Sequence, residues 1–201
     1  MRFVSDGLRY AGVALAASPV AAVVGTPLAG LAFVVLAAGI LHFFRDPPRS
    51  PPASGVVSPA DGRVSVVREE GDRLRVGVFM NVTDVHVNRA PVDGTVREVE
   101  HTPGAHRPAF TKDSDRNERV HVRLDAADGE TEVTLIAGAF ARRIHPWVEA
   151  GDELARGERL GHIAFGSRAD VLFPPGVEMD DLLVSKGDTV RAGESVLVDQ
   201  S

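Results

Sequence analysis

Two stretches of the chain, 148-VEAGDELARGERL-160 and 184-VSKGDTVRAGESV-196, repeat one pattern at an offset of 36 residues. The shared pattern is V-x-x-G-D-x-[LV]-x-x-G-E-x-[LV], in which Gly-Asp and Gly-Glu pairs separate short apolar segments. Gly, Asp and Glu at these places favour turns, and the apolar residues between them fall on one face of a short strand. The repeat therefore predicts two equivalent turn-and-strand units that share one core.

This repeat resembles the two half-motifs of the barrel-sandwich fold of lipoyl and biotinyl carrier domains. The segments around it are short, apolar and broken by Gly, Pro and Asp, which is typical of strands at hairpin spacing. We expect strands in GRVSVV, LRVGVFM, GTVREVE, RVHVRL, TEVTLIAGAF, ERLGHIAF, ADVLF and SVLVD, and one short helix or loop around residues 80–90. The fold class predicted is mostly β: a barrel-sandwich (lipoyl/biotinyl-like) β domain.

An apolar segment without Asp, Glu, Lys or Arg runs from Tyr10 to Phe44. It is too long for one membrane-spanning helix of about 20 residues. A turn signal, Gly25-Thr26-Pro27, divides it. A two-helix membrane hairpin is therefore favoured, with a single tilted helix after an interfacial segment, or a signal peptide, as alternatives.

Charge places both ends of this hairpin on one side of the membrane. Arg2 and Arg9 precede it, Arg45 and Arg49 follow it, and the turn is uncharged. By the positive-inside rule both ends face the cytoplasm. We thus expect a membrane-associated helical segment (1–44), a Pro/Ser linker RDPPRSPPAS (45–54) and a β-rich catalytic domain (55–201) at the cytoplasmic face of the cell membrane.

Composition excludes several classes of function. The chain has 201 residues and no cysteine, which excludes a disulfide framework and a thiolate zinc site. Its net charge of −6 gives no electrostatic footprint for nucleic acid. The histidines show no metal-ligand spacing, so we expect no metal site.

Two segments carry candidates for acid-base chemistry. In SPADGRV (58–64), Asp61 belongs to a hairpin corner or acts as a residue that orients or deprotonates a partner. In MNVTDVHVNRAPVDG (80–94), His86 would face away from Val85 and Val87 if the segment is extended. His86 is thus a general-base candidate, the alternative being a structural histidine.

A polar loop, RPAFTKDSDRNERVHV (107–122), ends in a strand. It contains Phe110 and the cluster Asn117-Glu118-Arg119, which is suited to binding a phosphate or carboxylate. The alternative is a solvent-exposed link. A further pair, Gly166-Ser167, stands between two strand-like segments and is no signal by itself.

Taken in order, five segments resemble the short type of phosphatidylserine decarboxylase proenzyme. They are FFRDPPR after the apolar N-terminus, SPADG, FMNVTDVHVNRAPVDG, RNERV and FGSRADVLFP. The resemblance runs from about Leu41 to the C-terminus. It implies a carboxy-lyase that converts a serine phospholipid headgroup, in phosphatidylserine or the archaeal archaetidylserine, to ethanolamine.

The resemblance also implies self-cleavage between Gly166 and Ser167, into a large chain 1–166 and a small chain 167–201. The Ser167 hydroxyl would attack the Gly166 carbonyl, and β-elimination would then leave a pyruvoyl group at residue 167. That group would form a Schiff base with the substrate amine and replace an external cofactor. Asp61 and His86 would supply the base in a triad-like arrangement, and His86 the final proton.

The partners implied are the phospholipid substrate, the membrane, and the large and small chains as a heterodimer, with a dimer of these also known in the family. One departure stands out: many relatives have a second histidine three residues after the first, and Arg89 occupies that place here. Either His86 serves both reactions or another group assists it.

Three other functions were weighed. A lipoyl- or biotinyl-type carrier module needs a modifiable lysine at a hairpin tip, but Lys186 lies inside the repeat's turn. A lysostaphin-like zinc endopeptidase needs a His-x-His pair, which is absent. A fold that has lost its activity is suggested by Arg89 and opposed by the intact Gly166-Ser167 pair.

Overall fold

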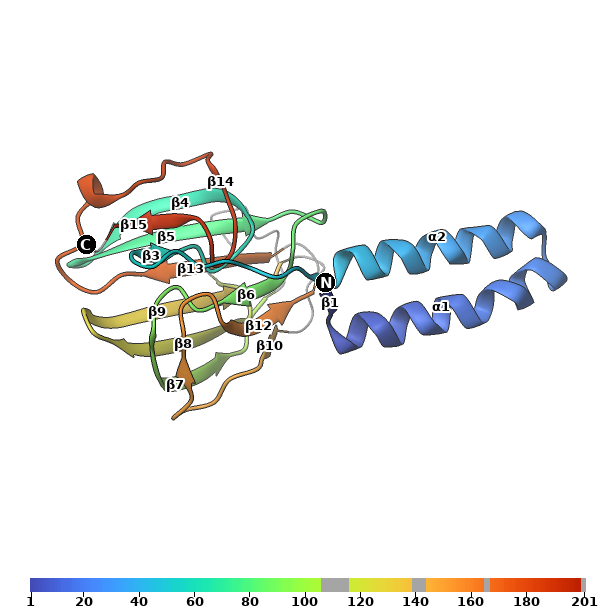
Figure 1. Cartoon of the computed structure of the whole chain (residues 1–201), viewed down its shortest axis with the longest axis horizontal. Helices are drawn as coiled ribbons and strands as arrows, with labels where there is room; N and C mark the ends of the chain where they lie inside the picture. The colour runs from blue at the N-terminus through green and yellow to red at the C-terminus, as the bar shows by residue number, and fades with distance from the viewer. Residues whose placement is uncertain (106–115, 139–143, 165–166, 200–201) are drawn as a thin grey trace. The chain divides into compact units, whose positions relative to one another are not determined.

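The computed structural model describes residues 1–105, 116–138, 144–164 and 167–199. The chain forms two compact units, Met1–Pro48 and Arg49–Ser201. The regular structure of the first unit is mostly helical, and that of the second is almost entirely β-strand (Figure 1). Each unit is taken by itself below.

The first unit is the predicted helical hairpin. Helices α1 (Ser5–Val24) and α2 (Pro27–Phe43) are flanked by a two-stranded ladder of β1 (Arg2–Phe3) and β2 (Arg45–Asp46). The turn signal acts as expected: Thr26 caps α2 by accepting a hydrogen bond from the Ala29 amide at 3.2 Å, and Pro27 takes the first helical position.

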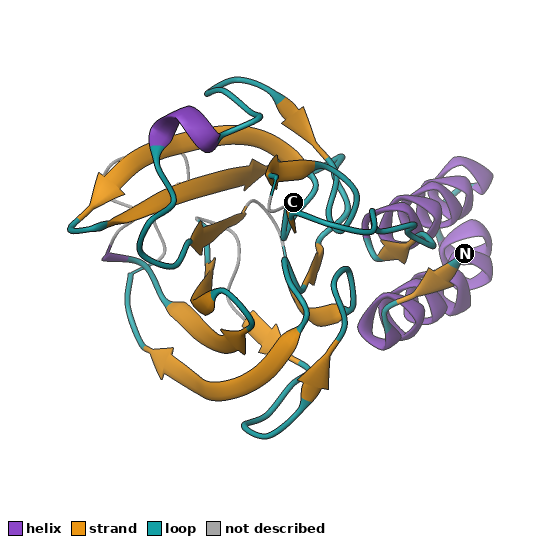
Figure 2. Ribbon diagram, turned by 60° about the vertical axis from the view of Figure 1, so that its left-hand side comes forward, coloured by secondary structure: helices purple, strands orange, loops and turns teal. Residues whose placement is uncertain are grey.

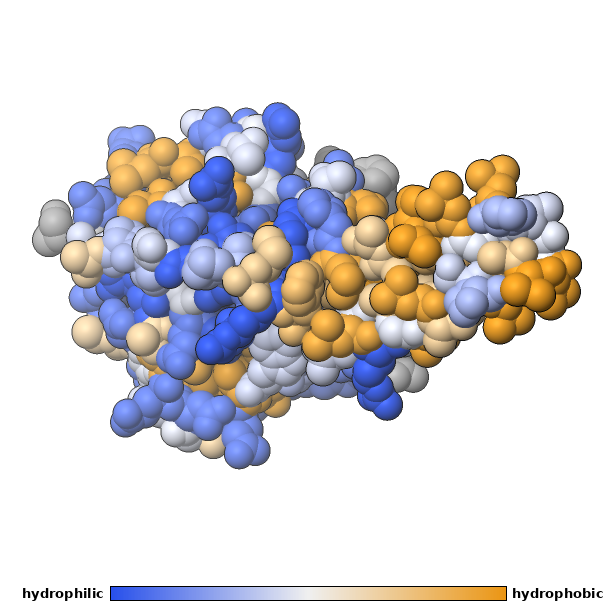
Figure 3. All heavy atoms as spheres, turned by 45° about the vertical axis from the view of Figure 1, so that its right-hand side comes forward, coloured by the Kyte–Doolittle hydropathy of each residue, from blue (hydrophilic) through white to orange (hydrophobic). Residues whose placement is uncertain are grey.

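Small residues allow the two helices to approach closely. A β-carbon on Gly30 would lie 2.7 Å from the Ala22 β-carbon, and Ser18 Oγ donates to the Gly30 carbonyl at 3.0 Å. Large apolar side chains point outward instead, and Figure 3 shows them (orange) gathered over this unit. Within the described residues, α1 is long and apolar enough to cross a membrane, and α2 is shorter.

The second unit is built on an eight-stranded antiparallel sheet, ordered β11-β7-β8-β9-β13-β5-β4-β14, which curls into a half-barrel (Figure 2). A three-stranded sheet, β10-β12-β6, and a pair, β15-β3, accompany it. The strands are β3 (Val56–Val57), β4 (Gly62–Glu70), β5 (Arg73–Met80), β6 (Val87–Arg89), β7 (Gly94–Thr102), β8 (Arg119–Ala126), β9 (Gly129–Ile136), β10 (Ile144–Pro146), β11 (Glu153–Leu154), β12 (Arg159–Ile163), β13 (Ser167–Leu172), β14 (Thr189–Val190) and β15 (Val196–Val198). The predicted fold class, mostly β with an N-terminal helical hairpin, is confirmed.

The sequence repeat at 148–160 and 184–196 forms equivalent structures. Its first copy supplies β11, which pairs with β7, and leads into β12; its second supplies β14, which pairs with β4, and leads into β15. The partner strands repeat as well. The segments 59-PADGRV-64 and 91-PVDGTV-96, offset by 32 residues, open β4 and β7.

Hydrogen bonds show how closely the two halves correspond. The Val64 amide donates to the Asp188 carbonyl at 2.9 Å, and the Val96 amide donates to the Asp152 carbonyl at 2.8 Å. The halves also cross: Val57 N–H donates to the Pro91 carbonyl, and Arg89 N–H to the Pro59 carbonyl, both at 2.9 Å. The unit therefore has an internal pseudo-twofold relation.

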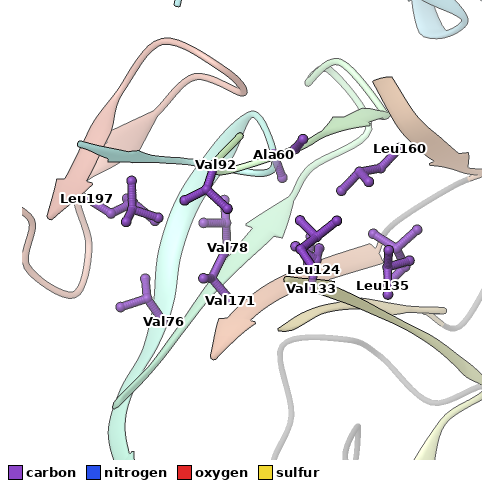
Figure 4. Packing of buried hydrophobic residues seen from close by; sticks show 14 of the residues in the cluster. Ala60, Val76, Val78, Val92, Leu124, Val133, Leu135, Leu160, Val171 and Leu197 are labelled. Carbon is purple, nitrogen blue, oxygen red and sulfur yellow. The ribbon is translucent and has the colours of Figure 1, made fainter. Parts of the chain in front are cut away.

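The core lies inside the half-barrel. Figure 4 shows the side chains from both halves packed there, among them Ala60, Val92, Leu160 and Leu197 with the sheet residues Val76, Val78, Leu124, Val133, Leu135 and Val171. Alternation along the strands sends these residues inward and the charged ones outward.

The structure differs from the expected strands in several places. The strand expected in TEVTLIAGAF ends at Ile136, before Gly138, a residue type that weakens strands. A 3₁₀ turn, η2 (Met179–Asp181), follows β13 and was not expected. Residues 81–86 form a loop, one of the two alternatives predicted around residues 80–90, but Val87–Arg89 of the same range form strand β6.

Candidate active site

Ser167 is the first residue of β13 and is fully buried. Its strand lies between β5 and β9, and Ser167 itself is paired with Met80. The Ser167 hydroxyl oxygen is 3.9 Å from the Met80 sulfur. Gly166, the other half of the predicted cleavage site, lies outside the described residues.

The start of β13 is fixed by a charge pair directly after Ser167. Arg168 donates from Nε to Asp170 Oδ1 at 2.7 Å and from Nη2 to Oδ2 at 3.0 Å. Both side chains are buried, and Arg75 Nη1 lies 3.6 Å from Asp170 Oδ2. Gly77 makes room for this carboxylate, because a β-carbon there would lie 2.5 Å from Asp170 Oδ1. Such bidentate pairs have a defined geometry, so the two side chains that follow Ser167 are fixed against each other.

His86 ends the loop that leads from Met80 and is buried. Its Nδ1 lies 3.0 Å from the Asp84 carbonyl oxygen. A carbonyl only accepts, so Nδ1 carries the proton and Nε2 carries the lone pair of the neutral ring. The His86 carbonyl accepts from the Ile163 amide at 3.3 Å, which ties the loop to the strand that precedes Ser167. His86 thus has the tautomer that a general base requires.

Asp61 lies at the predicted hairpin corner before β4. Its neighbour Gly62, at φ +140°, packs so closely on the Phe79–Met80 backbone that a β-carbon would lie 2.1 Å from the Phe79 carbonyl oxygen. Both Asp61 carboxylate oxygens lie 2.8 Å from Arg49 Nη2, and Oδ1 also accepts from the Ala192 amide at 2.8 Å. These contacts hold the turn that carries the second repeat.

The pseudo-twofold mate of Asp61 makes the same type of contact. Asp93 Oδ1 accepts from the Arg156 amide at 2.9 Å, and Arg156 Nη2 donates to Oδ2 at 3.0 Å. The mate is mostly exposed, whereas Asp61 and its arginine are largely buried. Turn stabilisation is therefore common to both aspartates, and only Asp61 lies against the strand that pairs with Ser167.

Asn117 and Arg119, which are predicted to bind substrate, lie at or just before the start of β8, at the same end of the sheet as Ser167. Arg119, Ile136 and Arg168 are in register across β8, β9 and β13. The buried Asn117 side chain donates to the Ala137 carbonyl at 2.7 Å, which is a structural contact, and Arg119 Nε donates to the Asn117 carbonyl at 3.2 Å. Phe110 lies outside the described residues.

Arg89, at the place of the second histidine, is buried in β6. Its Nη1 donates to the Gly157 carbonyl at 2.8 Å, at the turn of the first repeat copy. It therefore contributes a backbone contact there, whereas a histidine would bring a titratable ring.

An ion network on the outer face of the sheet was not expected from the sequence. Burial of Glu132 opposes its ionisation, yet hydrogen bonds from His121, Thr134 and Arg123 outweigh burial and lower the pKa of Glu132 to about 2. The His121 Nδ1 lies 2.9 Å from Glu132 Oε1. The network joins β8 and β9 beside β13, so it supports the sheet rather than the chemistry.

The chain is similar to known proteins along most of its length. A profile of the family described as "Phosphatidylserine decarboxylase" matches residues 36–198. A Halobacterium salinarum protein named "Putative archaetidylserine decarboxylase proenzyme" is 61% identical over 179 residues, which cover 89% of each chain.

Bacterial relatives are similar over comparable lengths. The phosphatidylserine decarboxylase proenzyme of Thermobifida fusca is 52% identical over 165 residues, 82% of this chain and 75% of its own. That of Solibacter usitatus is 42% identical over 199 residues, 98% of this chain and 96% of its own. The chain therefore belongs to the phosphatidylserine decarboxylase family, a family of carboxy-lyases.

Proposed function

We propose that the chain is a pyruvoyl-dependent decarboxylase of a serine phospholipid, activated by its own cleavage between residues 166 and 167. Family membership supports the reaction class and speaks against the carrier alternative. The observation that carries the cleavage proposal is Ser167 itself, a fully buried serine at the first position of a strand that is paired on both sides.

Cleavage requires a nucleophile, a base and a fixed backbone. The Ser167 oxygen would bond to the carbonyl carbon of residue 166, the peptide C–N bond would break, and the hydroxyl proton would end on the freed nitrogen. Removal of the Ser167 Cα proton would then expel the residue 166 carboxylate and leave dehydroalanine. Its hydrolysis would release ammonia and leave a ketone at residue 167.

We assign the base to His86 and keep Asp61 as a second candidate. The Nδ1–H contact to the Asp84 carbonyl leaves Nε2 as the basic nitrogen of His86. Asp61 is close to the same strand, but its carboxylate already binds Arg49 and the Ala192 amide. Both of its oxygens are already engaged, so mutation is used below to test its role.

The surroundings of residue 167 fit a pyruvoyl group. Met80 offers an apolar, water-excluded neighbour, and the β13 ladder keeps the new chain end in place. When present, the group supplies an electrophilic carbonyl that takes up the headgroup amine and accepts the electron pair left by CO2. His86 would return the proton, and Arg119, with Asn117 and Phe110 as further candidates, would bind the phosphate or carboxylate of the headgroup.

The helical hairpin would hold the enzyme at its lipid substrate. Helix α1 is long and apolar enough to span, and arginines flank the hairpin at both ends, which favours the cytoplasmic face of the cell membrane. Anchoring raises the local concentration of substrate without adding chemistry. The headgroup is the same in diacyl and archaeal diether lipids, and the archaeal relative makes the diether substrate the first to test.

Intact-mass analysis of the full chain in detergent tests the proposal. The wild type should give two chains, the smaller starting at residue 167 with a blocked N-terminus, and should release CO2 from a serine lipid. Ser167→Ala should remain one inactive chain. Ser58→Ala is the matched control, since Ser58 is equally buried and donates to the Ala60 carbonyl at 2.7 Å. An inactive wild type that stays one chain with an unmodified Ser167 contradicts the proposal.

A further inference from the structure

Asn88 occupies a core position where the other half of the fold has a valine. The offset of 32 residues that relates the two halves pairs Asn88, in β6, with Val56, in β3. Both are fully buried, and Val56 belongs to the hydrophobic core. An apolar residue is therefore compatible with the fold at this position, and Asn88 places a polar amide where the other half has an apolar side chain.

The contacts of Asn88 leave its side-chain acceptor unused. Nδ2 donates to the Met80 sulfur at 3.6 Å and lies 3.4 Å from the Pro59 carbonyl oxygen. Oδ1 is buried and accepts no hydrogen bond from the described part of the chain. A buried polar atom without a partner destabilises the folded state, so the retention of an asparagine here points to another use.

Asn88 and Ser167 both contact the side chain of Met80. Ser167 Oγ and Asn88 Nδ2 both lie within 4 Å of the Met80 sulfur, so that one side chain separates them. A thioether is a weak acceptor, and an amide oxygen is a strong one. A turn of the Asn88 amide that brings Oδ1 to the side of Met80 would therefore offer the Ser167 hydroxyl a stronger acceptor than the thioether.

We propose that Asn88 is a positioning residue for chemistry at residue 167: its Oδ1 accepts a hydrogen bond from the Ser167 hydroxyl and aims the oxygen at the carbonyl of residue 166. This inference rests on the proposed self-cleavage. Asn88 is neutral and takes no proton. The single hydroxyl proton leaves the hydrogen bond to Asn88 when the base takes it, and it then passes to the nitrogen released when the 166–167 peptide bond gives way to the ester.

Two variants of the full-length protein test this role. Asn88→Val copies Val56, and Asn88→Thr has a hydroxyl in place of one methyl group of that valine. Cleavage of each variant is followed by mass spectrometry after synthesis. Unfolding is measured separately, with each Asn88 substitution combined with Ser167→Ala so that every chain stays whole. Hydroxylamine, which splits esters, reports whether an ester at residue 167 accumulates. We expect Asn88→Val to cleave about 10 times more slowly without accumulating ester, because one hydrogen bond that orients the nucleophile is lost.

In the Ser167→Ala background, Asn88→Val should have a melting temperature equal to or higher than that of the chain with Asn88. Asn88→Thr should recover part of the cleavage rate that Asn88→Val loses. Cleavage of Asn88→Val at the wild-type rate overturns the inference while leaving the proposed function intact. A slower rate accompanied by a matching loss of stability, with no recovery in Asn88→Thr, also overturns it, because the role is then structural. A wild type that never cleaves refutes the proposed function instead.

Discussion

The pseudo-twofold relation offers an internal control for the role of Asp61. Asp61→Asn and Asp93→Asn make the same chemical change at equivalent turns. Each asparagine keeps an amide oxygen that can accept the backbone hydrogen bond of the original aspartate, from Ala192 or from Arg156. Only Asp61 adjoins the strand that pairs with Ser167. We expect both variants to be destabilised to different extents and only Asp61→Asn to cleave slowly.

The magnitudes follow from burial. The side chains of Arg49 and Asp61 are 6% and 15% exposed, and breaking such a pair costs about 3 kcal/mol, the low end of the buried range, because Glu194 still lies 3.4 Å from Arg49. The Asp93 side chain is 66% exposed, so its pair with Arg156 is worth roughly 1 kcal/mol or less. That difference corresponds to roughly 4–8 °C in melting temperature for a chain of this size.

Unfolding is compared by thermal melts in the Ser167→Ala background, and cleavage by mass in chains that retain Ser167. If Asp61 also acts as a base, Asp61→Asn should slow cleavage by about 100-fold or more. Wild-type cleavage in Asp61→Asn would refute a catalytic role. Equal slowing in Asp93→Asn would show that turn integrity, and not chemistry, limits the reaction.

Other predictions concern single sites. His86→Gln keeps the size but not the basic nitrogen, and should slow cleavage by about 100-fold with an unchanged melt in the Ser167→Ala background; a wild-type cleavage rate would remove His86 from the mechanism. With its pKa lowered to about 2, Glu132 should contribute roughly 3 kcal/mol at pH 5 that is lost as the pH falls through 2. In the Ser167→Ala background, where the chain stays whole, urea unfolding at pH 5 and 3 should show a loss roughly 2 kcal/mol larger with Glu132 than with Glu132→Gln. Gly30→Ala should lower the melting temperature of the helix pair in detergent, because its β-carbon would lie 2.7 Å from that of Ala22, whereas Gly39→Ala, with open space around it, should not. Equal melting of those two variants would argue against close packing at Gly30.

The sequence predicts the long strands and the helical hairpin because each has a local cause. Alternating apolar residues mark β4, β5, β7 and β8, and a turn signal divides the apolar N-terminus. The strands β3, β11 and β14 have two residues each, which is too few for an alternation of apolar and polar residues to be recognised. They form because the repeated turns place them next to a partner strand. The second repeat, P-x-D-G-x-V, was present in the sequence and would have located them.

The candidate site is predicted less completely, for a related reason. Motifs predict Ser167, His86 and Asp61 as candidates, but a motif does not show that Asp61 is held by Arg49 or that Asn88 stands in a core position. The buried pair Arg168 and Asp170 had a local signal, since residues two apart share one face of a strand. Only the structure shows that Asn88 is a polar residue at a core position, because the equivalent residue in the other half is then seen to be Val56.

The place of β13 has a consequence for how the protein is made. Each strand of the described segment 167–199 pairs with a strand from before residue 166: β13 with β5 and β9, β14 with β4, and β15 with β3. A precursor assembles this sheet as one connected chain, in a first-order process. A chain cut at 166–167 and then unfolded must find its other piece by collision, and a fragment of this size rarely folds alone. Recovery after denaturation should thus depend on concentration, so that the precursor provides the only efficient opportunity to fold.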